Sequence, residues 1–271
     1  MSAEDAGAGA LRIVPGQPRE LVVFDEVHEC PYFDRRPARL PLRLPIRSLH
    51  PDELDLRLAA GDRRQGPLLY RPSCPGCAAC VPLRLDVERF TFSRSQRRIY
   101  ARGLRDFSLE FGPPVVDERR VELYNRHKLE RGLGGTDSRI DERGYAAFLG
   151  ETCCDSHELR VSHQGRLIGV SVFDCGASAL SAVYCFYDPD YSHWSLGTLA
   201  ILREIELCRF LGLRHLYLGL FVEGCEQMAY KARFLPHEEC RNGVWIQVRT
   251  RVPGEEAQPS GRGGCHGGEC E

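Results

Sequence analysis

Lysine is almost absent from this chain of 271 residues. Of its 36 lysine and arginine residues, only Lys128 and Lys231 are lysine. Codon bias explains most of the preference for arginine, and a lysine kept in such a background indicates a position where a guanidinium group would not serve. The net charge of −2 excludes a protein that coats nucleic acid non-specifically, so any nucleic-acid site must be a local patch.

Long hydrophobic runs are missing too. No apolar segment approaches the roughly 18 residues of a transmembrane helix, and the N-terminus lacks the cationic and apolar regions of a signal peptide. Its 13 cysteines are odd in number and scattered, which is untypical of a secreted disulfide framework. We therefore expect a cytoplasmic protein that binds neither membranes nor DNA.

A cluster of thiols is the strongest feature that is present. In Cys74-Pro-Gly-Cys77-Ala-Ala-Cys80, three cysteines recur at every third position on a Pro/Gly turn, and Cys30 is the best upstream candidate for a fourth ligand. Such spacing is typical of zinc or iron–sulfur ligation in a reducing compartment, and it does not separate the two. The alternative is that the thiols are reduced and merely packed.

Two stretches of the chain carry arginine without acid. The first, residues 35–47, is either a solvated face or an anion site. The second, residues 89–105, includes a helix predicted to begin at Ser93. Arg94, Arg97 and Arg98 lie within about one turn of that helix, which favours phosphate contact.

The chain divides by composition into four segments. Residues 1–20 and 251–271 are rich in glycine and alanine or glycine and proline, and we expect them to be disordered tails. Between them we expect a small cysteine-rich N-terminal module at 21–111 and a more regular domain at 112–250.

The second domain alternates strand and helix patterns. We expect helices at 118–131 and 141–149, a hairpin at 158–173 that turns at Gln164-Gly165, a strand at 179–187, a helix from Ser195 to 211, a strand at 215–220 and a helix at 226–234. This order predicts an α/β (α+β) fold with an acetyltransferase-like C-terminal domain. Fold alone does not fix the chemistry.

A second anion site is predicted where the helix at 195–211 begins. The segment Ser195-Leu-Gly197-Thr198 follows a strand, so free N–H groups at the helix start can face a phosphate. Plain capping by Ser195 explains the segment equally well. Tyrosines and cations fall near the same cleft, although strand tyrosines are often only half-buried packing. They are Tyr184, Tyr187, Tyr230, Lys231 and Arg233.

Several short motifs occur in an order that resembles the aminoacyl-tRNA–protein transferase family, in particular its short bacterial branch. They are Cys30-Pro-Tyr, Tyr70-Arg-Pro-Ser-Cys-Pro-Gly-Cys, Ser93-Arg-Ser-Gln-Arg-Arg98, Tyr187-Asp-Pro, Ser195-Leu-Gly-Thr, Tyr217-Leu-Gly and Tyr230-Lys-Ala-Arg-Phe234. The resemblance spans residues 28–247, nearly all of the chain between the tails.

The resemblance implies transfer of an aminoacyl group from charged tRNA to proteins that begin with Asp or Glu, which marks them for N-end-rule degradation. It implies a leucyl donor, as in the bacterial branch, with the arginyl donor of eukaryotic relatives as the alternative. Leu220 stands where bacterial members usually have an aromatic residue. The chemistry needs no cofactor, and a metal on Cys30, Cys74, Cys77 and Cys80 would have a structural or redox-sensing role.

Roles for single residues follow from their positions in this scheme. An aminoacyl ester is already activated, so positioning and charge stabilisation suffice. We assign catalysis to Tyr184, Tyr187 and Lys231, and recognition of the acceptor carboxylate to Arg71 and Arg84. We assign contacts with tRNA to the following residues: Arg94, Arg97, Arg98, Ser195, Gly197, Thr198 and Arg233.

Two other classes of protein explain part of the sequence. A non-catalytic metal-knuckle RNA-binding protein accounts for the thiols and arginines but leaves the second domain unused. A coenzyme A acetyltransferase accounts for the second domain, yet it normally needs a fuller phosphate loop than Ser195-Leu-Gly-Thr and gives no reason for the thiols.

Overall fold

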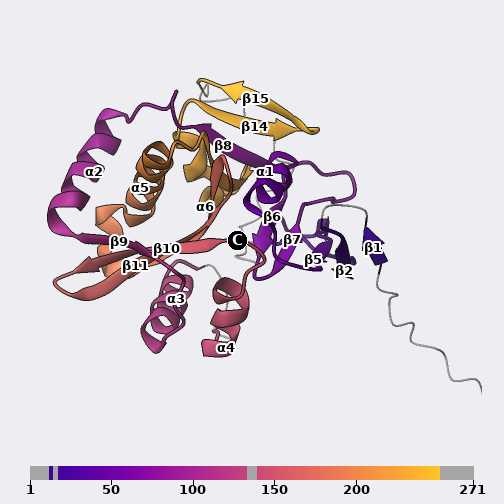
Figure 1. Cartoon of the computed structure of the whole chain (residues 1–271), viewed down its shortest axis with the longest axis horizontal. Helices are drawn as coiled ribbons and strands as arrows, with labels where there is room; N and C mark the ends of the chain where they lie inside the picture. Colours follow the sequence, from indigo (N-terminus) through magenta and orange to yellow (C-terminus); the bar gives the residue numbers. More distant parts are fainter. Residues whose placement is uncertain (1–11, 15–17, 133–138, 251–271) are drawn as a thin grey trace, which may run out of the picture.

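Two β-sheets organise the computed structural model, which describes residues 12–14, 18–132 and 139–250. The larger sheet has eight strands in the order β15-β14-β8-β13-β12-β11-β10-β9 (Figure 1). The smaller has five strands in the order β1-β2-β5-β7-β6, and β3 and β4 form a separate pair. The expected α/β class is confirmed by this mixed sheet and its helices.

The larger sheet is antiparallel except for one pair. Its strands are β8 (Cys80–Asp86), β9 (Ser108–Gly112), β10 (Ser156–His163), β11 (Arg166–Cys175), β12 (Ala179–Tyr187), β13 (His215–Val222), β14 (His237–Arg241) and β15 (Val244–Val248). Only β12 and β13 run parallel. The predicted hairpin is confirmed: Gln164 and Gly165 have φ of 51° and 80°, as a two-residue turn between twisted strands requires.

Helices cover both faces of this sheet. In Figure 1, α2 (Arg94–Asp106) and α5 (Leu196–Leu211) lie on one side of the β9–β11 strands, and α3 (Glu118–Glu130) and α4 (Glu142–Tyr145) lie on the other. A π-helix (Ala146–Gly150) extends α4, and a 3-10 helix (Tyr230–Arg233) extends α6 (Glu226–Ala229). Another 3-10 helix (Pro189–Trp194) precedes α5. In the described part of the chain, no helix is both long and apolar enough to cross a membrane.

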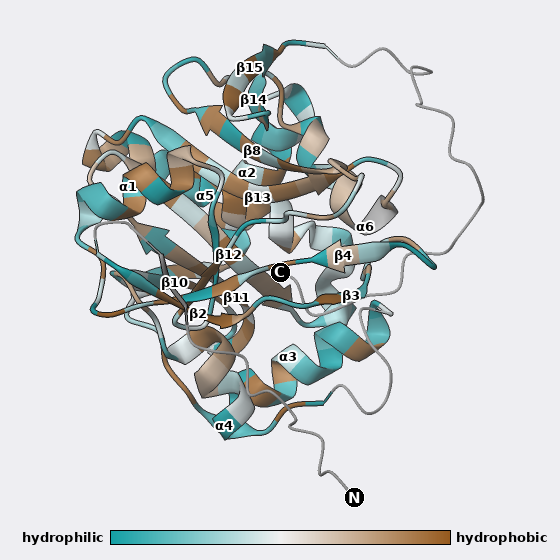
Figure 2. Cartoon of the chain, turned by 90° about the vertical axis from the view of Figure 1, so that its right-hand side faces the viewer, coloured by the Kyte–Doolittle hydropathy of each residue, from teal (hydrophilic) through white to brown (hydrophobic). Residues whose placement is uncertain are grey.

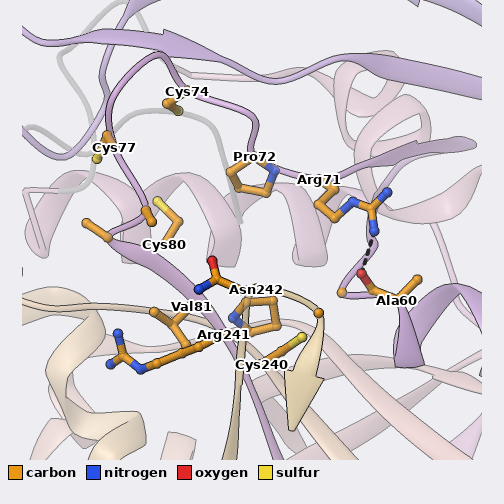
Figure 3. A pocket seen from close by; sticks show the side chains of 15 residues that line it. Ala60, Arg71, Pro72, Cys74, Cys77, Cys80, Val81, Cys240, Arg241 and Asn242 are labelled. Carbon is orange, nitrogen blue, oxygen red and sulfur yellow. Dashed lines mark hydrogen bonds between the residues drawn. The ribbon is translucent and has the colours of Figure 1, made fainter.

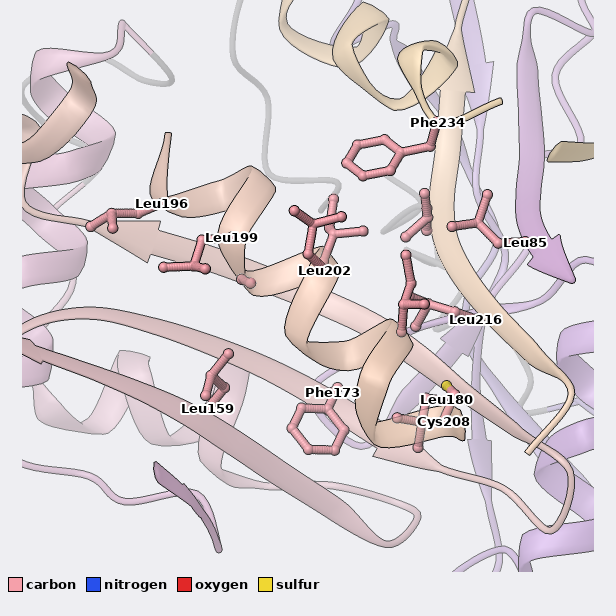
Figure 4. Close-up of a cluster of buried hydrophobic side chains, with 14 of the residues drawn as sticks. Leu85, Leu159, Phe173, Leu180, Leu196, Leu199, Leu202, Cys208, Leu216 and Phe234 are labelled. Atoms are coloured by element: carbon pink, nitrogen blue, oxygen red, sulfur yellow. The ribbon is translucent and has the colours of Figure 1, made fainter. Parts of the chain in front are cut away.

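The main core lies between α5 and the sheet. Leu196, Leu199 and Leu202 of α5 are buried against strand residues that include Leu159 and Phe173 (Figure 4). α2 packs on α5 through Gly103, because a Cβ there would lie 2.5 Å from Leu199 Cδ1. This close approach explains a glycine inside a helix, where it is otherwise unfavourable.

The smaller sheet starts earlier than the composition predicted. Its strands are β1 (Arg12–Val14), β2 (Glu20–Phe24), β5 (Leu42–Pro45), β6 (Arg63–Gln65) and β7 (Leu68–Tyr70), and β3 (Val27–Glu29) pairs with β4 (Pro37–Arg39). The expectation that residues 1–20 form a disordered tail is wrong for Arg12–Val14, which pair with β2. Residues 1–11, 15–17 and 251–271 lie outside the described residues.

The two expected modules share one sheet. β8 and β9 belong to the segment predicted as the N-terminal module, yet β8 lies between β13 and β14 and β9 pairs with β10. A buried ion pair adds to the junction: Arg64 Nε lies 2.8 Å from Asp174 Oδ2, with side chains 2% and 1% exposed. Helix α1 (Pro51–Ala59) also docks near the sheet (Figure 1). The structure therefore has no clean division at residue 112.

Candidate functional site

A break in the large sheet occurs where β12 and β13 separate. Ala179, Leu180 and Ser181 pair with β13. Residues 182–187 keep their pairing with β11 and have no strand partner on the β13 side within the described residues. An unpaired strand edge presents peptide N–H and C=O groups that no ladder uses. Such N–H groups are suited to hold an oxyanion.

Two buried cations lie at this break. Arg63, from β6 of the smaller sheet, donates from Nη1 to Ser181 Oγ at 2.9 Å and from Nη2 to Ala182 O at 2.5 Å. Lys231 Nζ donates to Leu220 O at 3.1 Å. The two side chains belong to residues that are only 7% and 5% exposed. Positive charge is thus held beside the free edge of β12, away from bulk water.

Gly219 lies between the two cations. Its φ of +85° favours glycine, and a Cβ there would lie 3.2 Å from Arg63 Nη2 and 3.3 Å from Lys231 Nζ. The glycine of Tyr217-Leu-Gly therefore lets both cations approach the strand. Lys231 was predicted as a functional residue from sequence, whereas Arg63 was not.

The two predicted catalytic tyrosines have different surroundings. Tyr184 packs among aromatic rings on the side of α3, with Tyr124 and Phe148 each 5.5 Å away between centroids. Tyr187 is buried, and its hydroxyl accepts from Arg131 Nη1 at 2.6 Å. Because the two residues are three apart on a strand, they point to opposite faces. The structure does not bring both hydroxyls to one reacting atom.

Tyr187 and the histidine that packs on it are both neutral near pH 7. Burial raises the pKa of the Tyr187 hydroxyl. The ring of His127 lies 4.6 Å from the Tyr187 ring, and His127 Nδ1 is 3.0 Å from Tyr187 O. Burial lowers the pKa of His127 to about 4, so this imidazole is neutral near pH 7. Both groups therefore hold their positions without carrying charge.

The start of α5 differs from the prediction. Ser195 has φ 58° and ψ 48°, in the left-handed region, and its side chain makes no cap hydrogen bond. Of the two interpretations of this segment, capping by the Ser195 side chain is therefore not supported. At Gly197 a Cβ would lie 3.8 Å from Tyr187 Cε1, an ordinary contact, and Thr198 is half-buried on the first turn.

Helix α2 carries the predicted basic face. Ser93 and Gln96 form a capping box: Gln96 N donates to Ser93 Oγ at 3.2 Å, and Ser93 N donates to Gln96 Oε1 at 2.8 Å. Exposed arginines free of ion pairs with any described residue lie near this helix start: Arg94, Arg97, Arg98 and Arg233. Arg233 belongs here because its neighbour Phe234 packs on Phe90, with ring centroids 6.1 Å apart.

The first arginine run is largely structural. Arg39 forms a bidentate pair with Asp25 at 2.7 and 2.8 Å. Arg43 bridges Glu20 and Asp62, and Arg47 binds Glu53. These three side chains are therefore not available to bind an anion, which was one of the two interpretations of residues 35–47. Of the two arginine runs, the one around α2 therefore keeps exposed side chains that are unpaired within the described residues.

A pocket of about 310 Å³ lies beside the thiol loop (Figure 3). Its walls are the loop that carries Cys74, Cys77 and Cys80, the side chain of Arg71, and the end of β14 with Cys240 and the turn that follows it. Arg71 Nη1 donates to Ala60 O at 2.6 Å, and Arg71 Nε lies 3.6 Å from Asp62 Oδ1, while 52% of the Arg71 side chain stays exposed. The pocket thus offers one partly free guanidinium among small residues.

Arg84, the other predicted acceptor residue, does not line this pocket. Its Nε binds Glu238 Oε2 at 2.7 Å and its Nη1 donates to Tyr217 OH at 3.0 Å. Its guanidinium also lies 4.2 Å over the ring of Trp245. With its charge and planar face already occupied, Arg84 fixes β8 to its neighbours, and its predicted role in substrate binding is not supported.

The predicted metal thiols do not converge. In the described part of the chain, no three of the sulfur atoms of Cys30, Cys74, Cys77 and Cys80 lie within 4.8 Å of one another. Tetrahedral zinc–thiolate bonds of about 2.3 Å place sulfur atoms about 4 Å apart. Cys30, Cys74 and Cys80 instead pack beside a hydrophobic cluster, and Arg39 N donates to Cys74 Sγ at 3.4 Å. This arrangement does not fit the predicted zinc or iron–sulfur centre.

Family comparisons cover both halves of the chain. Residues 28–98 match the model described as "Arginine-tRNA-protein transferase, N terminus", and residues 119–241 match "Arginine-tRNA-protein transferase, C terminus". The two matched segments include the thiol loop, the start of α2, and the break between β12 and β13.

Three curated relatives with the same name match most of the chain. The chain is 41% identical over 213 residues to an aspartate/glutamate leucyltransferase of Halorhodospira halophila, covering 78% of this chain and 90% of that one. It is 39% identical over 223 residues to that of Alkalilimnicola ehrlichii, covering 82% and 92%. The enzyme of the same name from Chromobacterium violaceum is 35% identical over 218 residues, covering 80% and 90%.

Solved structures resemble the chain more distantly. L-PGS from Bacillus licheniformis aligns with a TM-score of 0.41 at 11% identity, over 65% of this chain and 52% of that chain. A tandem GNAT protein from the clavulanic acid pathway aligns with a TM-score of 0.39 at 13% identity, over 79% and 59%. Likenesses of this size carry no functional argument.

Proposed function

The chain belongs to the arginine-tRNA–protein transferase family, and from that premise we propose that it transfers leucine from leucyl-tRNA to proteins that begin with Asp or Glu. Its activity is that of an aminoacyltransferase, and its substrates are an aminoacyl-tRNA and a protein. The observation that supports leucyl-tRNA as the donor is the 41% identity to an aspartate/glutamate leucyltransferase, across 90% of that enzyme. The tagged products would enter N-end-rule degradation.

Aminoacyl transfer from an activated ester requires correct positioning of the substrates rather than a strong nucleophile. The acceptor's α-amine has a pKa of about 8, so water or a weak base can remove its proton. The amine attacks the ester carbonyl carbon, a C–N bond forms, and the C–O bond to the ribose breaks. The proton released by the amine balances the one that the ribose oxygen takes up. An oxyanion develops on the carbonyl oxygen between these two steps.

The break between β12 and β13 supplies charge for that oxyanion. Lys231 and Arg63 hold positive charge there with little exposure to water, which strengthens its effect on a developing anion. The free edge of β12 adds peptide N–H groups. Tyr184 on that edge, or the vicinal 2′-hydroxyl of the tRNA, returns the proton to the ribose oxygen.

The basic surface around α2 is the proposed tRNA contact. Changing Arg94, Arg97 and Arg98 together to alanine removes about three phosphate contacts. We expect the affinity for tRNA to fall about 10- to 100-fold and the slope of log K against log salt to lose about 2 to 3 units. Filter binding at several salt concentrations measures both.

Arg105 provides the matched control for that variant. It lies on the same helix but is paired with Asp106 at 2.7 Å, so Arg105→Ala should leave the salt slope nearly unchanged. An unchanged slope in the triple variant would remove α2 from the tRNA surface.

The pocket beside the thiol loop is the proposed acceptor site, because Arg71 can form charge-assisted bonds to an Asp or Glu side chain. Arg71→Ala should raise the KM for a reporter with N-terminal Asp about 10-fold or more, which is about the strength of one charged hydrogen bond. The KM for leucyl-tRNA should stay the same. Steady-state transfer assays give both constants.

Arg241→Ala is the control for Arg71. Arg241 also lines the pocket, but its guanidinium is bound to Glu239 Oε2 at 2.7 Å. We expect a smaller change in the KM for the acceptor. Equal effects of the two substitutions would argue against a specific role for Arg71.

A transfer assay tests the proposed function as a whole. Purified protein receives labelled leucyl-tRNA or arginyl-tRNA together with reporters that begin with Asp, Glu, Arg or Ala. We expect label to move from leucyl-tRNA to the Asp and Glu reporters only. Transfer from arginyl-tRNA alone would overturn the donor, and binding of tRNA without any transfer would overturn the catalytic role.

A further inference from the structure

Three possible metal ligands meet at one end of the β10–β11 hairpin. Asp155 precedes β10, His157 is its second residue, and Cys175 ends β11. A carboxylate oxygen, a ring nitrogen and the Cys175 sulfur all lie within 4.8 Å of one another. Asp155 Oδ1 and His157 Nε2 are 3.1 Å apart. We propose that these three residues bind one divalent cation of the zinc type.

The donor set suits such a cation. Zinc takes thiolate, imidazole and carboxylate ligands together, and sites with three protein ligands leave a fourth position for water. The side chains of Asp155 and His157 are 61% and 38% exposed, so a cation and its water can enter from solvent. In the described part of the chain, neither side chain has a polar partner besides the other. The three donors are therefore available.

The backbone holds the ligands in place without a metal. Cys175 N donates to Asp155 O at 2.8 Å, which fixes the two ends of the hairpin to each other. The His157 ring stacks on Phe173 at 5.9 Å with an angle of 22°. Because the ladder pairs His157 with Phe173, little rearrangement is needed to close the site.

Local charge also favours a cation. Burial, and then the charges of Asp155 and Asp174, raise the pKa of the Cys175 thiol. Asp174 is already bound by Arg64 at 2.8 and 2.9 Å, so the remaining negative charge belongs to Asp155. A bound divalent cation would neutralise Asp155 and the Cys175 thiolate together.

The location suggests what the cation would stabilise. On one side of the site, Leu49 N donates to Cys153 O at 2.7 Å. On the other, Ala177 N donates to Pro51 O at 3.2 Å, and Ser178 N donates to Asp55 Oδ2 at 2.7 Å. The ligands thus lie between two contacts that dock α1 on the sheet, and a cation there would hold together the two strand ends on which α1 docks.

Titration of the full-length reduced protein with Co²⁺ as a spectroscopic probe, followed by Zn²⁺ competition, tests the site. The wild type is expected to bind one equivalent with a thiolate-to-cobalt absorption band that Zn²⁺ removes. Cys175→Ser, His157→Gln and Asp155→Asn should each weaken that binding by at least about 100-fold, since even changes outside the ligand shell weaken metal sites by about 10- to 100-fold. Zn²⁺ should raise the melting temperature of the wild type and not of these variants.

Two further variants separate this site from the other thiols. His193→Gln replaces an exposed histidine elsewhere and should bind like the wild type. Cys77→Ser changes the thiol loop and should also bind one equivalent of Co²⁺. Asp155→Asn removes the carboxylate charge but not the backbone oxygen that accepts from Cys175 N, so we expect this variant to keep the fold. The proposal would be overturned if both Asp155→Asn and His157→Gln bound Co²⁺ as well as the wild type does. It would also be overturned if Cys77→Ser no longer bound one equivalent of Co²⁺.

Discussion

Replacing Lys231 by alanine is expected to lower the single-turnover rate of leucyl transfer at least about 100-fold, the usual effect of removing one donor from an oxyanion site. Lys231 is a buried cation beside the unpaired edge of β12, where its charge is weakly screened. The affinity for leucyl-tRNA should change by less than about 3-fold, because the phosphate contacts lie on the exposed surface around α2. The rate is measured with enzyme in excess over charged tRNA.

Arg233→Ala is the matched control, since Arg233 lies on the same 3-10 helix and is exposed. It should weaken tRNA binding and leave the single-turnover rate at saturation nearly unchanged. A full rate in Lys231→Ala would exclude the residue from the chemistry. An equal loss in both variants would indicate damage to the helix rather than loss of a charge.

The substitution Lys231→Arg tests whether a positive charge alone is sufficient for the rate of leucyl transfer. The site has little room, because a Cβ on Gly219 would already lie 3.3 Å from Lys231 Nζ. A guanidinium is larger and planar, so it should displace Gly219 or leave the site, and activity should not be restored. Both lysines of the chain, Lys128 and Lys231, are buried, 4% and 5% exposed. Their retention among arginines agrees with positions that exclude a guanidinium.

Elements fixed by short-range chemistry were predicted well. The Ser93/Gln96 capping box places the start of α2, and Gln164-Gly165 places the hairpin turn, because both depend on neighbours within a few residues. Ser195 is the exception. It has the residue type of a cap, but its left-handed backbone, set by the entry from the preceding 3-10 helix, removes the capping geometry.

Features fixed by long-range pairing were not predicted. Arg63 reaches Ser181 across 118 residues, and nothing in the local segment Gly61-Asp-Arg63 indicates that contact. Arg84 looks free in sequence because its partner Glu238 is 154 residues away. The thiol spacing fixes a turn, but the distances between the four sulfur atoms depend on packing against a hydrophobic cluster that the spacing does not show. Sequence therefore identified the family, whereas the arrangement of charges around the break between β12 and β13 required the structure.

Glu204→Gln should make the protein more stable at alkaline pH than the wild type. Glu204 is fully buried between α5 and the sheet, where its Oε1 accepts from Ser171 Oγ at 2.7 Å. Its Oε2 has no partner within the described residues. Burial raises the pKa of Glu204 from 4.5 to about 7, and the bond from Ser171 offsets only part of this rise. The folded protein therefore holds a proton that the unfolded chain releases.

The direction of the pH dependence follows from that difference. Between about pH 4.5 and pH 7 the folded state binds more protons at this site than the unfolded state, so the free energy of unfolding falls as pH rises. A pKa difference of about 2.5 units corresponds to about 3 kcal/mol, which is fully lost above the folded pKa. Glutamine keeps the shape and the bond from Ser171 but cannot ionise, so its variant lacks this loss.

Urea unfolding of the wild type and Glu204→Gln at a series of pH values measures the effect. The two free energies of unfolding should nearly agree near pH 4 and differ by about 3 kcal/mol at pH 8. Taking the difference at each pH cancels other groups, such as His127, whose lowered pKa makes stability rise between about pH 4 and pH 6.5. Glu206→Gln, on the same helix but partly exposed and paired with Arg209, should show no such trend. A constant difference for Glu204→Gln across this range would mean that Glu204 is ionised in the folded protein, with a partner that stabilises its charge.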